Sequence, residues 1–558
     1  MFTRRDFLRI SAMASAAALM NWQCPALAKG GSRRRARHKD EYDAIIIGAG
    51  LGGLSCASFL TMNGFRPLVI DKRNKPGGYA TSFQRSVKCG RKRGRKRGRF
   101  TCEASLHGVT GNPQNQELLR QLGVLDKLTL IPHDSSWSSL YPDLPLNFPQ
   151  PPLDPDGHPD VNQALTNAYN ALASIFSDEA GLGPYMHYWG ELLREIEIFY
   201  AADASPNFAT FEDDYPTWYS MLYPTPLTLD ELLDTYGIND QKLRAILAQS
   251  WPYYGLPPSQ IPAWLYLMYT GLYYGYGNFY IQGTSQSLSD ALVDTIKEGG
   301  GKVLLNTEVK KIILDDNGRA VGVKVKNERR HLHTRHHRHH RHHNKYYANA
   351  VISNAAVPQT FDKLVPKSAH AQLTDYMDSI SSCQPSTSHF NVWLGLDLDK
   401  NDNFKESYEK LLSNTIVYPG YDHDEAYDAL LDCDPERSGF AVLAYDKLID
   451  GFSPEGHVSI TLSMLSAYEP WKQFEADYFS GRKNRRWHGK NKRKKRYYEE
   501  KKRITETLIS LAEEYVLPGL SEVIVMKEAS TPLTNVRFTL NTQGAIYGYD
   551  QTMDNSGF

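Results

Sequence analysis

The chain has no net charge to attract a polyanion, because 63 Lys and Arg residues balance 63 Asp and Glu residues. Its basic residues are concentrated in three short tracts at 91–99, 329–345 and 482–496, so the remaining sequence is acidic. This distribution excludes a global charge attraction to nucleic acid, and we predict no such partner. The tracts hold too few apolar residues to order themselves, so we expect solvated loops without a catalytic part.

The sequence also lacks the residue patterns that are typical of metal sites and of catalytic nucleophiles. The six cysteines are scattered, and none has the C-x-x-C or Cys/His spacing of a zinc site. No Ser-His-Asp arrangement competes with the motif described below. We therefore predict no metal site.

The N-terminal apolar stretch at 12–20 is far shorter than the roughly 20 residues that a membrane-spanning helix needs. It follows a twin-arginine pattern around Arg4 and Arg5 and precedes Ala26-Leu27-Ala28, small residues of the kind a signal peptidase reads. We predict that 1–28 is a twin-arginine signal peptide. The expected partner is the twin-arginine (Tat) export machinery and the expected location is the periplasm. Peripheral association with a membrane surface stays open as well, although no single amphipathic helix requires it.

The mature chain begins with a pattern that predicts a compact βαβ unit. Residues 42–47 form a short, branched apolar run, typical of a buried parallel strand. A glycine-rich turn at 48–53, a helix at 54–63 and a second strand at 67–70 follow, and Asp71 ends that strand.

Gly48, Gly50 and Gly53 supply the G-x-G-x-x-G spacing of a dinucleotide-binding turn. Gly48 permits the tight turn, Gly50 leaves room for a diphosphate, and Gly53 lets the helix pack against the strand. The helix N-terminus offers free N–H groups to the diphosphate. Asp71 can accept both ribose hydroxyls and disfavours a 2′-phosphate, so NADP is not expected. The glycine pair Gly77-Gly78 just beyond it favours FAD over NAD.

Further α/β elements are predicted later in the chain. We expect helices at 116–128, 191–198, 229–248, 287–298 and 504–515, strands at 302–305 and 350–353, and a hairpin of 309–314 with 320–325. Residues 141–155 are Pro-rich and expected to be irregular. We predict an α/β fold: a Rossmann-like FAD-binding domain with an inserted, largely helical substrate domain. Its parts are FAD-binding at 41–135 and 281–360, substrate-binding at 136–280 and 361–530, and the start of a C-terminal FAD-binding segment at 531–558.

Several stretches resemble one family of flavoenzymes. They are residues 44–83, 100–108, 280–288, the hairpin through Val309, 350–354, 531–534 and 543–548. They are similar to the phytoene desaturase, carotenoid isomerase and retinol saturase family, a branch of the amine-oxidase-like flavoproteins. The resemblance implies FAD as cofactor and a long apolar, polyene-like substrate. It further implies an FAD site formed by Gly48, Ala49, Gly50, Gly52, Gly53, Asp71, Lys72, Gly77, Gly78 and Val309.

Glu103 and His107 lie in a segment that the resemblance places near the flavin ring, and they are our acid/base candidates. Structural hydrogen bonding is the alternative for both. The aromatic segment 251–280 could line a substrate tunnel or form ordinary helical core. Desaturation, saturation and isomerisation all remain open.

Two other functions also remain open. An amine-oxidase-like enzyme with a polar amine substrate would need acidic and aromatic residues facing the flavin. A non-catalytic binding protein is the third possibility, because members of the resembled family continue past the equivalent of 555–558 into a Gly-rich segment that closes over the flavin. We therefore expect the C-terminal FAD-binding segment to be incomplete in this sequence.

Overall fold

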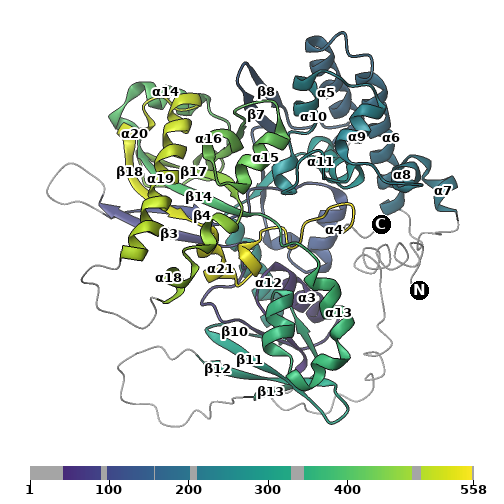
Figure 1. The fold of residues 1–558 in the computed structure, drawn as a ribbon, viewed down its shortest axis with the longest axis vertical. Coiled ribbons are helices and arrows are strands. Elements are labelled where there is room, and N and C mark those ends of the chain that lie inside the picture. Colours follow the sequence, from purple (N-terminus) through teal and green to yellow (C-terminus); the bar gives the residue numbers. More distant parts are fainter. Residues whose placement is uncertain are drawn as a thin grey trace.

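The computed structural model describes residues 42–88, 97–155, 157–201, 210–327, 345–480 and 492–555. The predicted signal peptide and most of the three basic tracts lie outside these ranges. The described chain forms three parts: a sheet with helices at the bottom of Figure 1, a second sheet at upper left, and a group of helices at upper right.

The first part is a six-stranded sheet. Four parallel strands lie in the order β10 (Lys302–Leu304), β2 (Pro67–Ile70), β1 (Tyr42–Ile47) and β13 (Lys345–Ser353). The antiparallel strands β12 (Ala320–Asn327) and β11 (Thr307–Leu314) continue the sheet beyond β13. Ile46 of β1 pairs with Val69 on one side and Ile352 on the other. This confirms the predicted Rossmann-like α/β fold, in which the later α/β block completes the sheet begun by β1.

Helices α3 (Leu51–Met62) and α12 (Ser285–Glu298) pack on this sheet. Leu54 and Ala57 of α3 and Ile296 of α12 join Val69 in one buried cluster. This packing fixes the start of α3 directly above the carboxyl ends of β1 and β2, the edge at which doubly wound sheets bind ligands.

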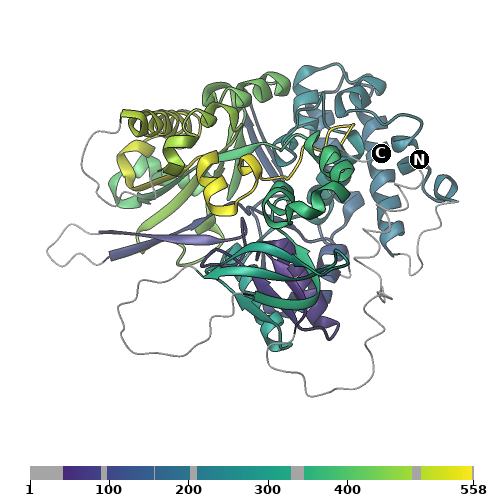
Figure 2. The same cartoon turned by 60° about the horizontal axis from the view of Figure 1, so that its bottom comes forward.

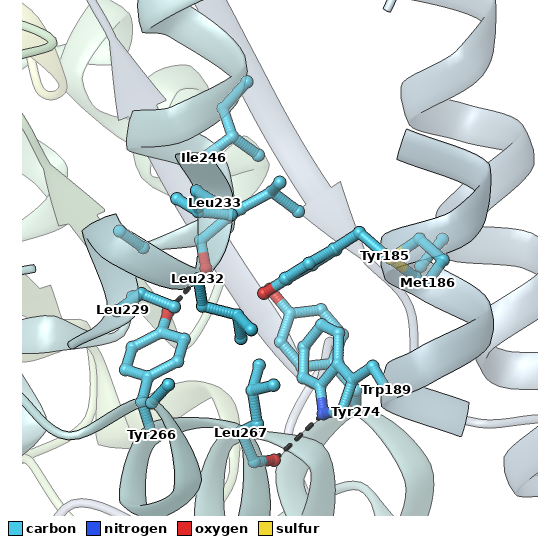
Figure 3. Packing of buried hydrophobic residues seen from close by; sticks show 14 of the residues in the cluster. Tyr185, Met186, Trp189, Leu229, Leu232, Leu233, Ile246, Tyr266, Leu267 and Tyr274 are labelled. Carbon is cyan, nitrogen blue, oxygen red and sulfur yellow. Dashed lines mark hydrogen bonds between the residues drawn. The ribbon is translucent and has the colours of Figure 1, made fainter. Parts of the chain in front are cut away.

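The middle of the chain is helical, as the fold prediction required. Figure 3 shows its core, in which Tyr185 and Trp189 of α6 lie near Tyr274 of α11. Trp189 Nε1 donates to the carbonyl of Leu267 at 2.9 Å. The helices of this part are α5 (Val161–Ile175), α6 (Leu182–Ala201), α7 (Phe211–Asp214), α8 (Pro216–Leu222), α9 (Leu229–Thr235), α10 (Gln241–Leu247) and α11 (Ala263–Tyr276).

The expected helix at 229–248 is in fact two helices. Gly237 has a φ of +66°, which the interior of a helix does not allow, and Asp240 caps α10 by accepting the N–H of Leu243. In the same way, the expected helix at 116–128 ends early, because α4 (Pro113–Gln121) stops before Gly123 at a φ of +67° and a short 3-10 turn, η1 (Leu125–Lys127), follows.

The second sheet has seven strands in the order β18 (Ile524–Ser530), β14 (Ser388–Asp397), β17 (His457–Ser466), β16 (Phe440–Leu443), β15 (Asn414–Val417), β7 (Trp137–Tyr141) and β8 (Leu144–Phe148). Strand β8 corrects the expectation that 141–155 is irregular. Pro145 is tolerated there because β8 is the edge strand and can leave one backbone N–H position without a partner. Helix α19 (Lys492–Tyr515) packs on this sheet through Ile504 and Leu508.

Two smaller sheets connect these parts. Strands β3 (Ser82–Lys88) and β4 (Arg97–Glu103) form a ribbon that projects from the body in Figures 1 and 2. Strands β5 (Val109–Thr110), β9 (Asn278–Ile281) and β6 (Leu130–Pro132) form the other. The remaining α-helices are α13 (Thr374–Ser381), α14 (Asp402–Lys410), α15 (His423–Leu431), α16 (Pro435–Ser438), α17 (Glu469–Lys472), α18 (Glu475–Ser480), α20 (Leu520–Val523) and α21 (Pro532–Thr539).

Each of the three basic tracts is partly structured, although solvated loops were predicted there. Residues 97–99 belong to β4, Lys345 begins β13, and 492–496 begin α19. Backbone pairing in a projecting ribbon does not require apolar side chains, and Lys and Arg are good helix formers at exposed positions. No described helix is both long and apolar enough to cross a membrane.

Candidate functional site

The glycine turn lies where β1 ends and α3 begins. Gly48 has a φ of +100°, and its N–H donates to the carbonyl of Ile70 at 2.9 Å, which joins the turn to β2. Gly50 precedes α3 as its N-cap and supplies no side-chain cap. The first N–H groups of α3 therefore lack the usual side-chain acceptor, and a diphosphate can take that place.

The glycines of the turn are needed for different reasons. A Cβ on Gly53 would lie 2.1 Å from the carbonyl oxygen of Gly48, and a Cβ on Gly52 would lie 2.7 Å from Oδ1 of Asn354. A Cβ on Gly50 would lie 3.2 Å from Nδ2 of Asn354. Asn354 thus lies against the turn, and its N–H donates to Ile47 at 2.8 Å.

Asn354 is a further residue of this site and is not among those predicted from the sequence. The signal was present, since Asn354 directly follows the buried strand predicted at 350–353, and the carboxyl ends of parallel strands meet at one edge.

Asp71 binds the backbone with both carboxylate oxygens. Oδ2 accepts the N–H of Ala49 at 2.7 Å, and Oδ1 accepts the N–H of Arg73 at 2.6 Å. Each oxygen keeps a further lone pair, so the carboxylate can still accept ribose hydroxyls.

The structure brings the predicted residues Lys72 and Val309 to the Asp71 end of the sheet. The N–H of Thr307 donates to the Asp71 carbonyl at 2.8 Å, which joins the start of β11 to the end of β2. Lys72 forms an ion pair with Glu308 at 3.2 Å, next to the buried Val309. The ammonium of Lys72 is thereby directed at β11.

The backbone of the glycine pair Gly77-Gly78 packs against the glycine turn at 48–53. The N–H of Gly77 donates to the carbonyl of Ala49 at 2.7 Å. Gly77 and Gly78 have φ angles of +115° and +64°, and a Cβ on Gly78 would lie 3.2 Å from Cα of Gly50. The glycines, free N–H groups and carboxylate together fit a dinucleotide of the ADP type.

A cavity of about 240 Å³ lies between the helical part and the seven-stranded sheet. Its described lining is mainly apolar and aromatic and contains no Asp, Glu, Lys or Arg. The lining residues are Ser105, Leu106, His107, Gly108, Trp251, Pro252, Tyr253, Tyr273, His389, Ile416, Tyr418, Ser438, Gly439, Phe440, Ala441, Leu443, Ser463, Leu465, Ile546 and Tyr547.

The cavity adjoins the glycine pair. Tyr79 directly follows Gly78, and its ring centroid is 5.8 Å from that of His389, which lines the cavity. The Tyr79 hydroxyl donates to the carbonyl of Gly544 at 2.7 Å, so the C-terminal segment lies against the same loop. A group bound along the glycine loops would therefore have one end beside the cavity.

His107 is the acid/base candidate that lines this cavity. Its Nδ1 lies 2.5 Å from the hydroxyl of Tyr445. Burial, together with the nearby His389 and His133, lowers the pKa of His107 to about 3. His107 is therefore a neutral imidazole at physiological pH, which suits a hydrogen-bond donor or acceptor better than a proton-transfer group.

Glu103, the other candidate, is fully buried and does not belong to the cavity lining. Its carboxylate accepts hydrogen bonds from the Tyr280 hydroxyl (2.5 Å), the N–H and hydroxyl of Ser285 (3.0 and 2.6 Å) and the N–H of Ala104 (2.9 Å). Burial raises the pKa of Glu103 to about 7, although these bonds oppose the shift. This arrangement joins β4 to β9 and to the start of α12, which indicates a structural role.

The aromatic segment 251–280 contributes to both a cavity and the helical core. Trp251, Tyr253 and Tyr273 line the cavity, whereas Tyr266 and Tyr274 belong to the helical core in Figure 3. Trp251 Nε1 and the hydroxyl of Ser438, both buried in the lining, have no hydrogen-bond partner among the described residues.

Within the described ranges, no group of three or more His, Cys, Asp and Glu side chains could hold a metal ion.

Comparisons with known proteins give consistent results. The family model of flavin-containing amine oxidoreductases matches residues 51–492. All-trans-retinol 13,14-reductase from Macaca fascicularis is 23% identical over 534 residues, which cover 93% of this chain and 78% of that protein. Prolycopene isomerase 1 from an Oncidium hybrid cultivar is 24% identical over 546 residues, covering 93% and 77%. A crystal structure of an oxidoreductase from Methanosarcina mazei matches 87% of both chains with a TM-score of 0.50 at 14% identity, which supports the fold alone.

Proposed function

Because this chain belongs to the family of flavin-containing amine oxidoreductases, we propose that it is an FAD-dependent oxidoreductase acting on a long apolar, polyene-like substrate. The observation that carries the substrate class is the cavity beside Gly77 and Gly78, whose described lining has no charged side chain. The resemblance in sequence to a retinol reductase and a prolycopene isomerase supports the same class.

The predicted residues would hold FAD by its ADP half. Asp71 would accept the ribose hydroxyls, and the N–H groups at the start of α3 would bind the diphosphate. Gly50 and Gly78 leave the space between their loops free of side chains. When bound, FAD supplies the two-electron redox chemistry.

The rest of the site would orient the substrate and exclude water. The transfer of an apolar chain from water to the aromatic lining is favourable, by on the order of 25 cal/mol per Å² of apolar surface removed from water. His107 would offer a neutral hydrogen bond to the bound cofactor or substrate.

A polar amine substrate is the alternative within the same family. An amine is a cation at neutral pH, and burying it without a carboxylate partner is costly. Aromatic residues are present in the cavity lining, but the described lining contains no carboxylate. This observation favours the apolar substrate over the amine.

The test is the visible spectrum of the purified full chain, recorded before and after reconstitution with FAD. Flavin absorbance near one per chain, bleached or shifted by a polyene in the absence of oxygen, is the expected result. Bleaching by an amine but never by a polyene would overturn the substrate class. Colourless protein that cannot be reconstituted with FAD would contradict the proposal that the chain is a flavoenzyme and would favour a non-catalytic binding protein.

We also propose export in the folded state, on the basis of the twin-arginine pattern at the N-terminus. Export of a folded protein allows the cofactor to be acquired in the cytoplasm. Replacing Arg4 and Arg5 by Lys should abolish delivery to the periplasm, measured by fractionation, and undiminished export would contradict this location.

A further inference from the structure

Tyr445 is hydrogen-bonded to the imidazole of His107, which lines the cavity. Tyr445 begins the 3-10 turn η6 (Tyr445–Lys447), one residue after the end of β16, and is 1% exposed. Its ring stacks on that of Tyr280, with centroids 4.7 Å apart and planes inclined by 29°. The Tyr445 hydroxyl lies 2.5 Å from Nδ1 of His107. Among the described residues the Tyr445 hydroxyl makes no other hydrogen bond, so its orientation depends on His107.

The direction of this hydrogen bond follows from what burial allows. Burial raises the pKa of Tyr445 well above its ordinary value, so the phenol keeps its proton. If Nδ1–H of His107 were the donor, the phenolic proton would be buried without an acceptor among the described residues. A buried donor without an acceptor is disfavoured, so Tyr445 donates and Nδ1 of His107 accepts.

A neutral imidazole has one N–H, which is then on Nε2. Nε2 has no hydrogen-bond partner among the described residues, and His107 lines the cavity. The backbone is held as well, because His133 Nε2 donates to the His107 carbonyl at 3.1 Å and His133 Nδ1 lies 2.9 Å from the Ser413 hydroxyl. Ring and backbone are thus both constrained.

We propose that Tyr445 is a positioning residue that fixes His107 in the Nε2–H tautomer, so that the imidazole is a permanent neutral donor toward a lone pair of the cofactor or substrate in the cavity. The identity of that acceptor rests on the proposed function, whereas the tautomer does not. The histidines facing the same region are His133 and His389, and burial keeps both neutral as well.

The tautomer can be read from nitrogen-15 spectra of the full chain labelled only at histidine, with His107→Gln used for assignment. Wild-type protein should show His107 with a proton on Nε2 alone between pH 5 and 8. Tyr445→Phe keeps the stacked ring but removes the donor, so both tautomers should appear. The pKa of His107 should also rise from about 3, because the neutral form loses its hydrogen bond.

Tyr408→Phe is the matched control, because the Tyr408 hydroxyl is buried and has no partner among the described residues. This control should leave the His107 signals unchanged. A proton on Nδ1 in the wild type, or an unchanged tautomer in Tyr445→Phe, would overturn the proposal.

Adding FAD, and then a polyene alcohol, tests the presentation of Nε2–H. The Nε2 resonance should shift in the wild type with one of these ligands and shift less in Tyr445→Phe. With a substrate that is turned over, kcat of Tyr445→Phe should fall by about tenfold with KM nearly unchanged. An Nε2 resonance that neither ligand moves would contradict the presenting role. Protein with the expected tautomer but no flavin binding would instead contradict the proposed function.

Discussion

The carboxylate of Asp71 accepts the backbone N–H of Ala49 at 2.7 Å, which ties the acidic end of β2 to the glycine turn after β1. The two parts of the dinucleotide fingerprint, 22 residues apart in sequence, are therefore held as one unit before any ligand binds. Preorganisation of this kind lowers the free-energy cost of binding.

Replacing Asp71 by Ala should weaken FAD binding by about 10- to 100-fold, the usual effect of losing hydrogen bonds to a charged group. Titration of flavin fluorescence measures the affinity. Asp43→Ala is the matched control, because Asp43 also accepts a backbone N–H, that of Arg66 at 2.8 Å, but at the opposite end of the parallel strands. If both variants lose FAD affinity to the same extent, Asp71 affects binding only through the stability of the fold.

Gly50 and Gly53 should respond differently to substitution by Ala. A Cβ on Gly53 would overlap the Gly48 carbonyl oxygen at 2.1 Å, so Gly53→Ala should destabilise the fold by about 1–3 kcal/mol. A Cβ on Gly50 would only press on the Asn354 side chain at 3.2 Å, so Gly50→Ala should fold but lose FAD affinity.

Thermal unfolding and flavin titration together separate these two effects. Gly183→Ala on α6 is the control, since the nearest atom to its Cβ would be 3.6 Å away. Normal FAD binding by Gly50→Ala would show that the diphosphate does not approach this turn.

The geometry of the two glycine loops could be predicted, because it depends on residues close together in the sequence. The turn at 48–53, Asp71 and Gly77-Gly78 lie within 31 consecutive residues, and backbone geometry alone restricts what such a glycine pattern can do. The cavity could not be predicted in this way. His107, Trp251, His389 and Tyr547 come from distant segments, and only tertiary packing decides which aromatic rings face a cavity and which face the core.

Glu103 shows a second limit of sequence reasoning. A carboxylate and an imidazole four residues apart were equally reasonable candidates for proton transfer. In the fold, Glu103 faces the start of α12, where Ser285 donates two hydrogen bonds to it, while His107 faces the cavity. The difference depends on the position of α12, which begins 182 residues later in the chain.

Trp251 should discriminate between apolar ligands with and without an oxygen atom. Its Nε1–H is buried behind the cavity lining without a partner among the described residues, so a ligand oxygen that reaches it after a small shift of the lining would supply the missing acceptor. Trp251→Phe should weaken the binding of a polyene alcohol by about tenfold and leave the affinity for the corresponding hydrocarbon nearly unchanged. Equilibrium binding of both ligands measures this. Trp137→Phe, which removes a buried N–H outside the lining, should change neither; equal losses for both ligands in Trp251→Phe would contradict a bond to oxygen.

Glu103 should make the stability of the protein depend on pH in a definite direction. Burial raises its folded-state pKa from 4.5 to about 7, so the folded protein binds more protons than the unfolded chain between these values. The stabilisation is fully present below pH 4.5 and is lost as pH rises through 7, a change on the order of 3 kcal/mol. Buried histidines such as His423, with a pKa lowered to about 4, act in the opposite direction, because their stabilisation is lost as pH falls.

The contribution of Glu103 is therefore isolated by comparing variants across the same pH range. Glu103→Gln resembles the protonated carboxyl and cannot titrate, so its free energy of unfolding in urea should not show the decrease between pH 4.5 and 7. The histidine effects are common to both proteins and cancel in the difference. Glu409→Gln, at an exposed position, should follow the wild type. Identical pH profiles for wild type and Glu103→Gln would mean that the Glu103 carboxyl is ionised throughout, held by Tyr280 and Ser285 strongly enough to cancel its burial.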